Sequence, residues 1–265
     1  MTQSAAPHTA APILLLRGVG RRFGGLAAVS DVDLEVAPGE RRAILGPNGA
    51  GKTTLFNLIA GDIPATSGKI AFLGEDLSLV SAPERTQRGI GRTYQKSRLF
   101  LGLSVEDNLY LAVMGTRGGH FRLRRSGRDR ELRERARELA GAVGLGERLD
   151  ALVGSLSHGE QRQLEVGMAR ATDPKLMLLD EPASGLSRGE RGALTDLLLS
   201  LDSSITLMLI EHDMDVALRV AGRVTMMHDG RKIVEGTPDE IRGNDLVHEL
   251  YLGGRVTGEG IEATG

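Results

Sequence analysis

Short apolar segments alternate with longer amphipathic ones along most of the chain, which is the pattern of a protein built from strands and helices. The segments that predict strands are residues 13–16, 32–36, 42–45, 68–72, 176–179, 205–210, 224–227 and 232–235. Apolar residues at Val32, Leu34 and Val36 alternate with polar ones, as in a half-buried antiparallel strand. The uninterrupted run Leu176–Leu179 is instead typical of a strand buried on both faces. Asp229-Gly230 separates the last two segments and predicts a hairpin turn.

Helical patterns fill most of the intervals between these strands. They cover residues 52–60, 105–145, 159–171, 188–201 and 213–221, and a further helix is expected to begin at Ser81, with Pro83 and Glu84 in its first turn. Because strands and helices alternate in the central part, the chain predicts a parallel sheet with crossover helices. The mostly helical stretch from about residue 95 to 158 interrupts that alternation. We expect it to be a helical subdomain inserted into an α/β domain.

Composition narrows the possible classes of protein. The chain has 265 residues, of which 40% are hydrophobic and 26% charged, as in ordinary globular proteins. A formal net charge of -2 gives no indication that nucleic acid or an anionic membrane is a partner. The sequence has no Cys, which excludes disulfides, thiol catalysis and cysteine-ligated metals. No apolar run approaches the roughly 18 residues of a membrane-spanning helix.

The two ends differ from the rest of the chain. Residues 1–12 are rich in Ala, Pro, Ser and Thr and lack the basic and apolar regions of a secretory signal, so they predict a disordered tail. Residues 254–265 contain several glycines and predict a flexible tail. Residues 13–253 are expected to form a single domain.

The strongest motif is Gly46–Thr53, which matches G-x-x-x-x-G-K-[ST] between a predicted strand and a predicted helix. Backbone amides of such a loop and the N-terminus of the following helix bind phosphate oxygens. Lys52 supplies a full positive charge for the β- and γ-phosphates, and Thr53 offers a hydroxyl ligand for Mg²⁺. The motif therefore predicts binding of a nucleoside triphosphate together with Mg²⁺.

Two acidic residues follow the buried apolar run. Asp180 and Glu181 stand at the carboxyl end of a predicted strand, which is where open α/β sheets bind ligands. We expect Asp180 to hold Mg²⁺ through water and Glu181 to polarise an attacking water. A pair of solvated acids at a strand end is the alternative. The phosphate-binding loop (P-loop) predicted at Gly46–Thr53 disfavours it.

A third motif, Leu156–Glu160, resembles the signature of the ABC ATPase family, which is usually Leu-Ser-Gly-Gly-Gln. It departs from that signature at His158 and Glu160 but keeps Ser157 and Gly159, whose hydroxyl and amide at a helix N-terminus form an anion site. An ordinary helix cap is the alternative for this motif alone. The resemblance covers about residues 14–253 and implies the ABC ATPase fold: a P-loop NTPase core with a mixed sheet, an antiparallel β subdomain and the inserted helical subdomain.

The resemblance also implies roles for individual residues. Glu181, His212 and Lys52 would be catalytic, and Thr53, Gln95 and Asp180 would bind Mg²⁺. The residues implied to bind ATP are Phe23, Gly46, Pro47, Asn48, Gly49, Ala50, Gly51, Lys52, Thr53, Thr54, Gln95, Ser157 and Gly159. Ser157 and Gly159 would act on the ATP of a partner subunit. Phe23 would stack on adenine, with a packed core position as the alternative.

Several segments are similar to the ATPases of branched-chain amino acid importers, whose wider uptake family includes urea and amide importers. They are Phe23–Leu26, Tyr94-Gln95, Arg98–Phe100, Glu211–Met214 and Leu250–Gly253. The resemblance implies a second ATPase subunit, either a copy of this chain or a sister chain. It also implies two integral-membrane permease subunits and, indirectly, an external solute-binding protein. The chain would then lie at the inner face of the cell membrane.

Other functions fit the sequence less well. A non-transport ABC ATPase usually has long coiled coils or two cassettes, and neither is found here. A P-loop kinase or GTPase would lack the signature and the His after a strand, and no Asn-Lys-x-Asp motif is present. Intact Lys52, Asp180, Glu181 and His212 oppose a catalytically idle subunit.

Two features have no role assigned by the resemblance. Ser187 stands where the family loop commonly has Asp. The stretch 116–137 contains nine Arg, which could meet lipid phosphates or an acidic permease loop. Interleaved Asp129, Glu131 and Glu134 favour instead a solvated, ion-paired helix.

Overall fold

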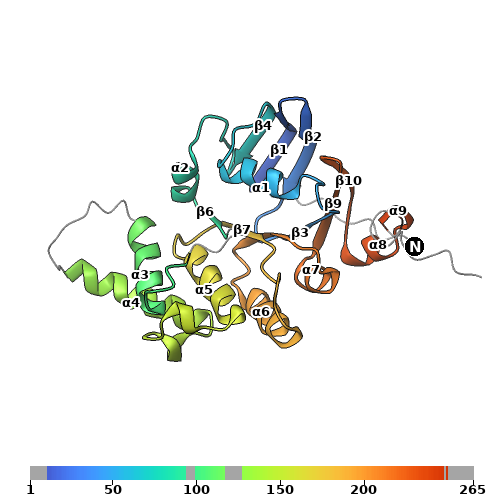
Figure 1. Cartoon of the computed structure of the whole chain (residues 1–265). Helices are drawn as coiled ribbons and strands as arrows, with labels where there is room; N and C mark the ends of the chain where they lie inside the picture. The colour runs from blue at the N-terminus through green and yellow to red at the C-terminus, as the bar shows by residue number, and fades with distance from the viewer. Residues whose placement is uncertain (1–10, 94–98, 117–126, 248, 250–265) are drawn as a thin grey trace, which may run out of the picture.

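Two sheets organise the computed structural model, which describes residues 11–93, 99–116, 127–247 and 249 (Figure 1). The larger sheet has six described strands in the order β10-β9-β3-β8-β7-β6. Their bounds are Arg231–Gly236 (β10), Arg223–His228 (β9), Arg41–Leu45 (β3), Thr206–Ile210 (β8), Leu176–Asp180 (β7) and Ile90–Arg92 (β6). Only the β9–β10 hairpin is antiparallel among these pairs. The predicted mixed sheet is therefore confirmed.

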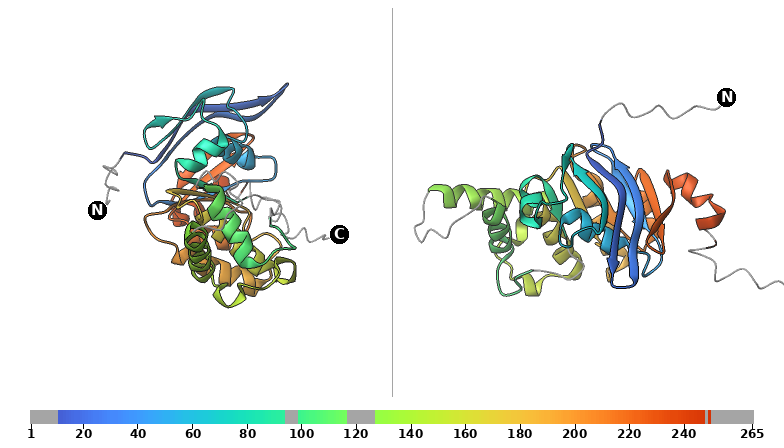
Figure 2. Two further views of the ribbon diagram at one scale, coloured as in Figure 1. Left: turned by 90° about the vertical axis from the view of Figure 1, so that its left-hand side faces the viewer. Right: turned by 90° about the horizontal axis from the view of Figure 1, so that it is seen from above.

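The smaller sheet is antiparallel and lies over one face of the larger one (Figures 1 and 2). Its described strands, in the order β2-β1-β4-β5, are Leu26–Val36, Leu14–Phe23, Ser67–Phe72 and Glu75–Asp76. In β2 the side chains of Val32, Leu34 and Val36 are buried and the intervening residues are exposed, as the alternation predicts. The antiparallel β subdomain is confirmed.

The first strand is longer than its apolar pattern predicts. We expected it to end at Leu16, but β1 continues to Phe23 and pairs with β2 along its whole length. The register shifts between Leu16 and Val19 and again on both sides of Arg21, so the second half of the strand is bulged. Bulges displace the two-residue period, because an extra residue turns the following side chains to the other face. The alternation is therefore lost while the strand continues.

Helices cover both faces of the six-stranded sheet. Helix α1 (Lys52–Ala60) lies between the two sheets, and α5 (His158–Arg170), α6 (Arg188–Ser200) and α7 (Met214–Val220) cover the opposite face (Figure 1). Successive residues of β3 show the two cores: Ile44 packs in the cluster that contains α1, whereas Ala43 and Leu45 pack in the cluster that contains α5–α7. Every residue of β7 is buried, as the uninterrupted apolar run predicts.

Two groups of helices lie at opposite ends of the molecule (Figure 2). At one end are α3 (Val105–Thr116) and α4 (Gly127–Ala142), with the short turns η1 (Gly146–Arg148) and η2 (Val153–Ser155). At the other end are α8 (Pro238–Arg242) and α9 (Asp245–Val247). Helix α2 (Ala82–Gln87) begins after Ser81, with the predicted reciprocal capping by Glu84. The helical insertion between β6 and β7 is thus present, while its predicted limit at residue 95 falls outside the described residues.

The described part of the Arg-rich stretch is ion-paired. Arg133 lies within 3.3 Å of Glu106 and Asp107 on α3, and its guanidinium stacks on the Tyr110 ring at 4.7 Å. Arg137 also pairs with Glu106, at 3.2 Å. Residues 117–126 lie outside the described part of the chain. The interleaved acids also pair, Glu134 with Arg130 at 3.4 Å and Asp129 with Arg133 at 3.9 Å, so the described part of the stretch is ion-paired as predicted.

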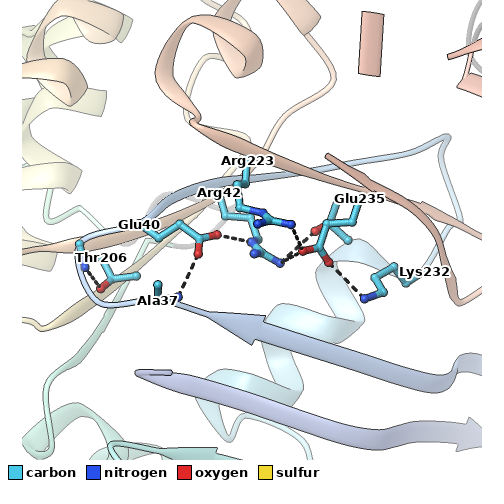
Figure 3. Close-up of polar contacts among 9 residues, drawn as sticks. Ala37, Glu40, Arg42, Thr206, Arg223, Lys232 and Glu235 are labelled. Atoms are coloured by element: carbon cyan, nitrogen blue, oxygen red, sulfur yellow. Dashed lines mark hydrogen bonds and ion pairs between the residues drawn. The ribbon is translucent and has the colours of Figure 1, made fainter. Parts of the chain in front are cut away.

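A buried ionic network closes the amino edge of the six-stranded sheet (Figure 3). Arg42, near the start of β3, is 1% exposed and contacts Glu40 at 2.5 Å and Glu235 at 3.3 Å. Glu235, on β10, also accepts hydrogen bonds from Arg223 and Lys232, at 2.9 and 3.1 Å. Burial alone would raise the pKa of Glu235, but the surrounding cations lower it below its ordinary value. The network joins three strands, and each of its charged groups has at least one partner of opposite charge.

None of the described helices is both long and apolar enough to cross a membrane.

Candidate functional site

The P-loop follows β3 and leads directly into α1. Gly46 and Gly51 have φ values of 150° and 93°, which favour glycine. A Cβ at Gly46 would lie 2.1 Å from the carbonyl oxygen of Met227, and one at Gly51 would lie 2.4 Å from that of Ala28. The loop therefore fits between β9 and β2 only without side chains at these two positions. The predicted helix bounds, Lys52–Ala60, are confirmed.

A cavity of about 460 Å³ opens above this loop. It is lined by Leu26, Ala27, Ala28, Asn48, Gly49, Ala50, Gly51, Lys52, Thr53, Thr54, Glu181 and Asp229. Most of the predicted phosphate-binding loop thus lines one cavity together with Glu181, although these residues are far apart in the sequence. The first residues of α1 line the same cavity, and the N-terminus of a helix favours an anion.

Lys52 is held in place by the loop itself. Its side chain is 6% exposed, and Nζ donates hydrogen bonds to the carbonyl oxygens of Gly46 and Pro47, at 2.6 and 2.9 Å. Burial lowers the pKa of Lys52, while the nearby carboxylates of Glu181 and Asp180 raise it. Two neutral carbonyls are weak partners for a buried ammonium group, so a phosphate would be a better one.

Asp180 ends β7 and is almost completely buried. Its Oδ2 lies 3.4 Å from Nη2 of Arg92, while Oδ1 is buried without a hydrogen-bond partner. Burial raises the pKa of Asp180, and Arg92 and the Thr53 hydroxyl lower it by less. An unpaired oxygen on a buried carboxylate is costly. A cation beside Asp180 and Thr53 would remove that cost.

The donors around Asp180 fit Mg²⁺. Mg²⁺ prefers oxygen ligands and is commonly bound by one or two protein groups plus water and substrate phosphates. The unpaired Oδ1 of Asp180 and the hydroxyl of Thr53 are oxygen donors of this kind. The third predicted ligand, Gln95, lies outside the described residues.

Glu181 directly follows β7 in a strained conformation. Its φ is 50°, a left-handed value that a residue with a side chain adopts at a cost of about 1 kcal/mol. Its amide donates to the carbonyl oxygen of Ile210 on β8 at 2.9 Å, which fixes the turn against the neighbouring strand. The backbone thus turns sharply where the chain leaves the sheet, and the side chain lines the cavity.

His212 follows β8, as predicted, and its side chain is 55% exposed. It does not line the P-loop cavity of its own chain. The preceding residue, Glu211, is fully buried and accepts hydrogen bonds from the amides of Ala183 and His212, at 2.8 and 3.3 Å. Burial raises the pKa of this carboxyl group. Glu211 therefore connects the loop after Glu181 to the backbone of His212.

Ser157 and Gly159 lie at the N-terminus of α5, outside the P-loop cavity. Ser157 is the N-cap, and Glu160 completes a capping box in which its carboxylate accepts from the Ser157 amide at 2.8 Å. Ser157 and Gly159 are therefore not part of the P-loop cavity of their own chain. Their action on a partner's ATP remains a prediction.

Phe23 stands at the end of β1 and is 46% exposed, so the alternative of a packed core position is wrong. It is not among the residues that line the P-loop cavity, and its ring stacks with the guanidinium of Arg21 at 4.6 Å. Stacking on adenine remains a prediction.

Sequence reasoning missed Arg92 and strand β6. Arg92 bridges Asp62 and Asp180, with Nη1 2.6 Å from Asp62. The next residue, Thr93, accepts a hydrogen bond from the Asp180 amide at 3.3 Å. A strand of three residues that contains a glycine has no detectable period, so only the pairing with β7 identifies it.

A second cavity, of about 310 Å³, lies between β6, α3 and α5. We call it the lateral groove. Thr93, Leu99, Ala112, Gly115 and Met168 are among its lining residues. Two of them flank the segment 94–98 that contains Gln95. The groove is thus adjacent in sequence to a predicted nucleotide contact.

Comparison with known proteins agrees with this geometry. A family profile described as "ABC transporter" matches residues 29–184, and one described as "Branched-chain amino acid ATP-binding cassette transporter" matches residues 231–257. The high-affinity branched-chain amino acid transport ATP-binding protein BraF of Pseudomonas aeruginosa is 37% identical over 252 residues, which cover 91% of this chain and 98% of BraF. LivG of Escherichia coli K12, named for the same transport, is 36% identical with the same coverage.

Solved structures give the same fold. The ADP conformation of MJ1267, an ATP-binding cassette of an ABC transporter, superposes with a TM-score of 0.82 at 28% identity. The alignment covers 92% of this chain and 100% of that one. With the P-loop, the Asp180–Glu181 pair and the α5 signature in their places, the chain belongs to the ABC transporter family, as one of its ATP-binding ATPases.

Proposed function

We propose that this chain is the ATP-hydrolysing subunit of an importer for branched-chain amino acids or related small solutes. The main observation behind this proposal is that Lys52, Thr53, Asp180 and Glu181 lie close together at the carboxyl edge of the sheet. The profile match at residues 231–257 and the names of BraF and LivG support branched-chain amino acids over urea or amide solutes.

Each residue has a distinct part in the proposed mechanism. Lys52 leaves the carbonyls of Gly46 and Pro47 and binds the β- and γ-phosphates. Thr53, Asp180 and Gln95 would hold Mg²⁺, which when bound would neutralise charge on the phosphates. Glu181 orients the attacking water and accepts its proton on the carboxylate. His212 contacts the γ-phosphate and maintains the position of Glu181 and the water.

Two chains are required to complete the site. Ser157 and Gly159 of a partner ATPase, either a second copy or a sister chain, bind the γ-phosphate from the opposite side. ATP then holds the two chains together, and hydrolysis removes this shared ligand. Closing and opening of the pair shift two permease subunits between two access states. The chain accordingly lies at the inner face of the cell membrane through its permeases, which receive solute from an external binding protein.

The Glu181→Gln variant tests the assignment of the base. Turnover should fall by about 100-fold or more, because a general base contributes about 10² to 10⁴ in rate. Light scattering should show an ATP-dependent dimer that persists, formed by the chain alone or with its sister ATPase. Glu131→Gln, which makes the same chemical change at an exposed position of α4 outside this cavity, is the control and should keep near-normal turnover. Unchanged turnover in Glu181→Gln would contradict the proposal.

The lateral groove is proposed as the place where a permease segment docks. Its lining residues Thr93 and Leu99 flank segment 94–98 in the sequence, so a permease docked there would be connected through the chain to Gln95. A Cβ at Gly115 meets no atom within 4 Å, so Gly115→Trp would fill the groove without disturbing the fold. Gly141→Trp on α4 is the matched control, since that position is equally open and lies outside the groove. Gly115→Trp alone should prevent co-purification with the permeases while ATP hydrolysis by the ATPase continues.

A further inference from the structure

The signature anion site of this chain already holds an anion. Oε1 of Glu190, on α6, accepts a hydrogen bond from the Gly159 amide at 2.9 Å. Ser157, the N-cap of α5, also helps to lower the pKa of this carboxyl group. A Cβ at Gly159 would lie 2.9 Å from Cγ of Glu190, so the absence of a side chain there allows the close approach.

The same carboxylate is held on its other side by the cap of α6. Ser187 donates to Oε2 of Glu190 through its amide at 3.0 Å and through its hydroxyl at 2.7 Å. Together these donors lower the pKa of Glu190 to about 2, so the group is ionised at neutral pH. Ser187, which replaces the usual Asp, contributes donors here, whereas an Asp carboxylate would repel Glu190.

We infer that Glu190 is a positioning residue that occupies, in the unpaired chain, the place of the γ-phosphate of the partner's ATP. The inference rests on the proposed function, in which Ser157 and Gly159 bind that phosphate. One amide proton serves one strong acceptor, and two anions cannot share the donors of one helix terminus without repulsion. Glu190 therefore has to withdraw from Gly159 before the ATP sandwich closes.

The arrangement allows this withdrawal without unfolding of α6. Of the three hydrogen bonds donated to the Glu190 carboxylate, one comes from the Gly159 amide and two come from Ser187. Loss of the bond from Gly159 leaves the capping box of α6 in place. Glu190 thus competes with the γ-phosphate of the partner's ATP for the Gly159 amide, and this competition raises the ATP concentration needed for dimerisation.

The test measures the ATP concentration at half-maximal dimerisation by light scattering, in the Glu181→Gln background. Glu190→Gln removes the competing charge, and Glu190→Asp keeps the charge but is one methylene too short to span both contacts. Both variants should lower the half-maximal ATP concentration about threefold to tenfold, because hydrogen bonds to an ionised acceptor are roughly twice as strong as neutral ones.

Glu240→Gln is the matched control, because Glu240 has the same capping role for α8, where Thr237 is the N-cap, and does not contact the signature. Circular dichroism verifies that α6 remains folded in each variant. A half-maximal ATP concentration equal to that of the control, or higher, would overturn the inference. Absence of any ATP-driven dimer in the parent, with itself or with the sister ATPase, would instead overturn the proposed function.

Discussion

The six-stranded sheet has buried charged groups at the amino edge, where the parallel strands begin, and at the carboxyl edge, where they end. The two edges differ in how far these charges are paired within the protein. At the amino edge, Arg42 pairs with Glu40 and Glu235 at 2.5 and 3.3 Å, and the pKa of Glu235 is lowered (Figure 3). At the carboxyl edge, one oxygen of Asp180 has no hydrogen-bond partner, and the pKa of Asp180 is raised. Strand β3 connects the two edges over five residues.

The difference follows from what each edge has to bind. Each charged group of the network around Arg42 has a partner of opposite charge within the protein, so the network can contribute to stability without any ligand. The charged groups near Asp180 have all their polar partners only when a cation binds Asp180 and a phosphate binds Lys52. Buried groups left unsatisfied are common at functional sites, where stability is given up for binding.

Asp180→Asn should have the largest effect and should act in opposite directions on function and stability. Loss of the Mg²⁺ ligand is expected to lower ATP turnover by about 100-fold or more. Because the pKa of Asp180 is raised in the folded state, its ionised form destabilises the protein at pH 7. The free energy of unfolding, measured in urea without nucleotide, should therefore rise by about 1 kcal/mol. A clear fall in the free energy of unfolding would show that the charges at both edges stabilise the protein without a ligand.

Arg42→Met should affect stability alone. It leaves two carboxylates without their buried cation, which typically costs about 3 kcal/mol. The turnover number of the folded variant should stay within about twofold, since the network lies at the edge opposite the P-loop. Arg17→Met is the control: the Arg17–Glu35 pair is 57% and 55% exposed, so its loss should cost less than about 1 kcal/mol. Equal losses in the two variants would contradict a special role for the network.

The pH dependence of unfolding should show a smaller effect at the amino edge. The pKa of Glu235 is lowered in the folded state, so its contribution is present above the ordinary pKa of about 4.3 and is lost as pH falls through the folded value. Between pH 5 and pH 3, the wild type should lose about 1 kcal/mol more than Glu235→Gln. Parallel pH profiles for the two proteins would rule out this contribution.

Local patterns predicted the parts of the fold and site that depend on neighbouring residues. The P-loop, the bounds of α1, the buried strand β7 and the Asp229-Gly230 hairpin each have their signal within a few residues. The fold class and the family followed from the order of such motifs along the chain.

Contacts between distant residues were not predicted, because no local pattern encodes them. Ser187 and Glu190 have the spacing of a capping box, yet nothing in that spacing indicates that Glu190 reaches Gly159, 31 residues earlier. Arg92 is likewise identified only by its position beside Asp180, 88 residues later. The longer β1 was missed because its bulges remove the period that marks a strand.

The order of strands in the large sheet sets the spacing of the groups that follow the strand ends near the P-loop. Neighbouring strands β9, β3, β8 and β7 are followed at their carboxyl ends by Asp229, the P-loop, His212 and Glu181, in that spatial order. Since adjacent strands are about 4.8 Å apart, the four strand ends span only about 14 Å. A change of one strand's length by a single residue would move its residue along the sheet but not across it. The distance between these groups from strand to strand is therefore set by backbone hydrogen bonding, and it does not depend on the side chains that fill the core.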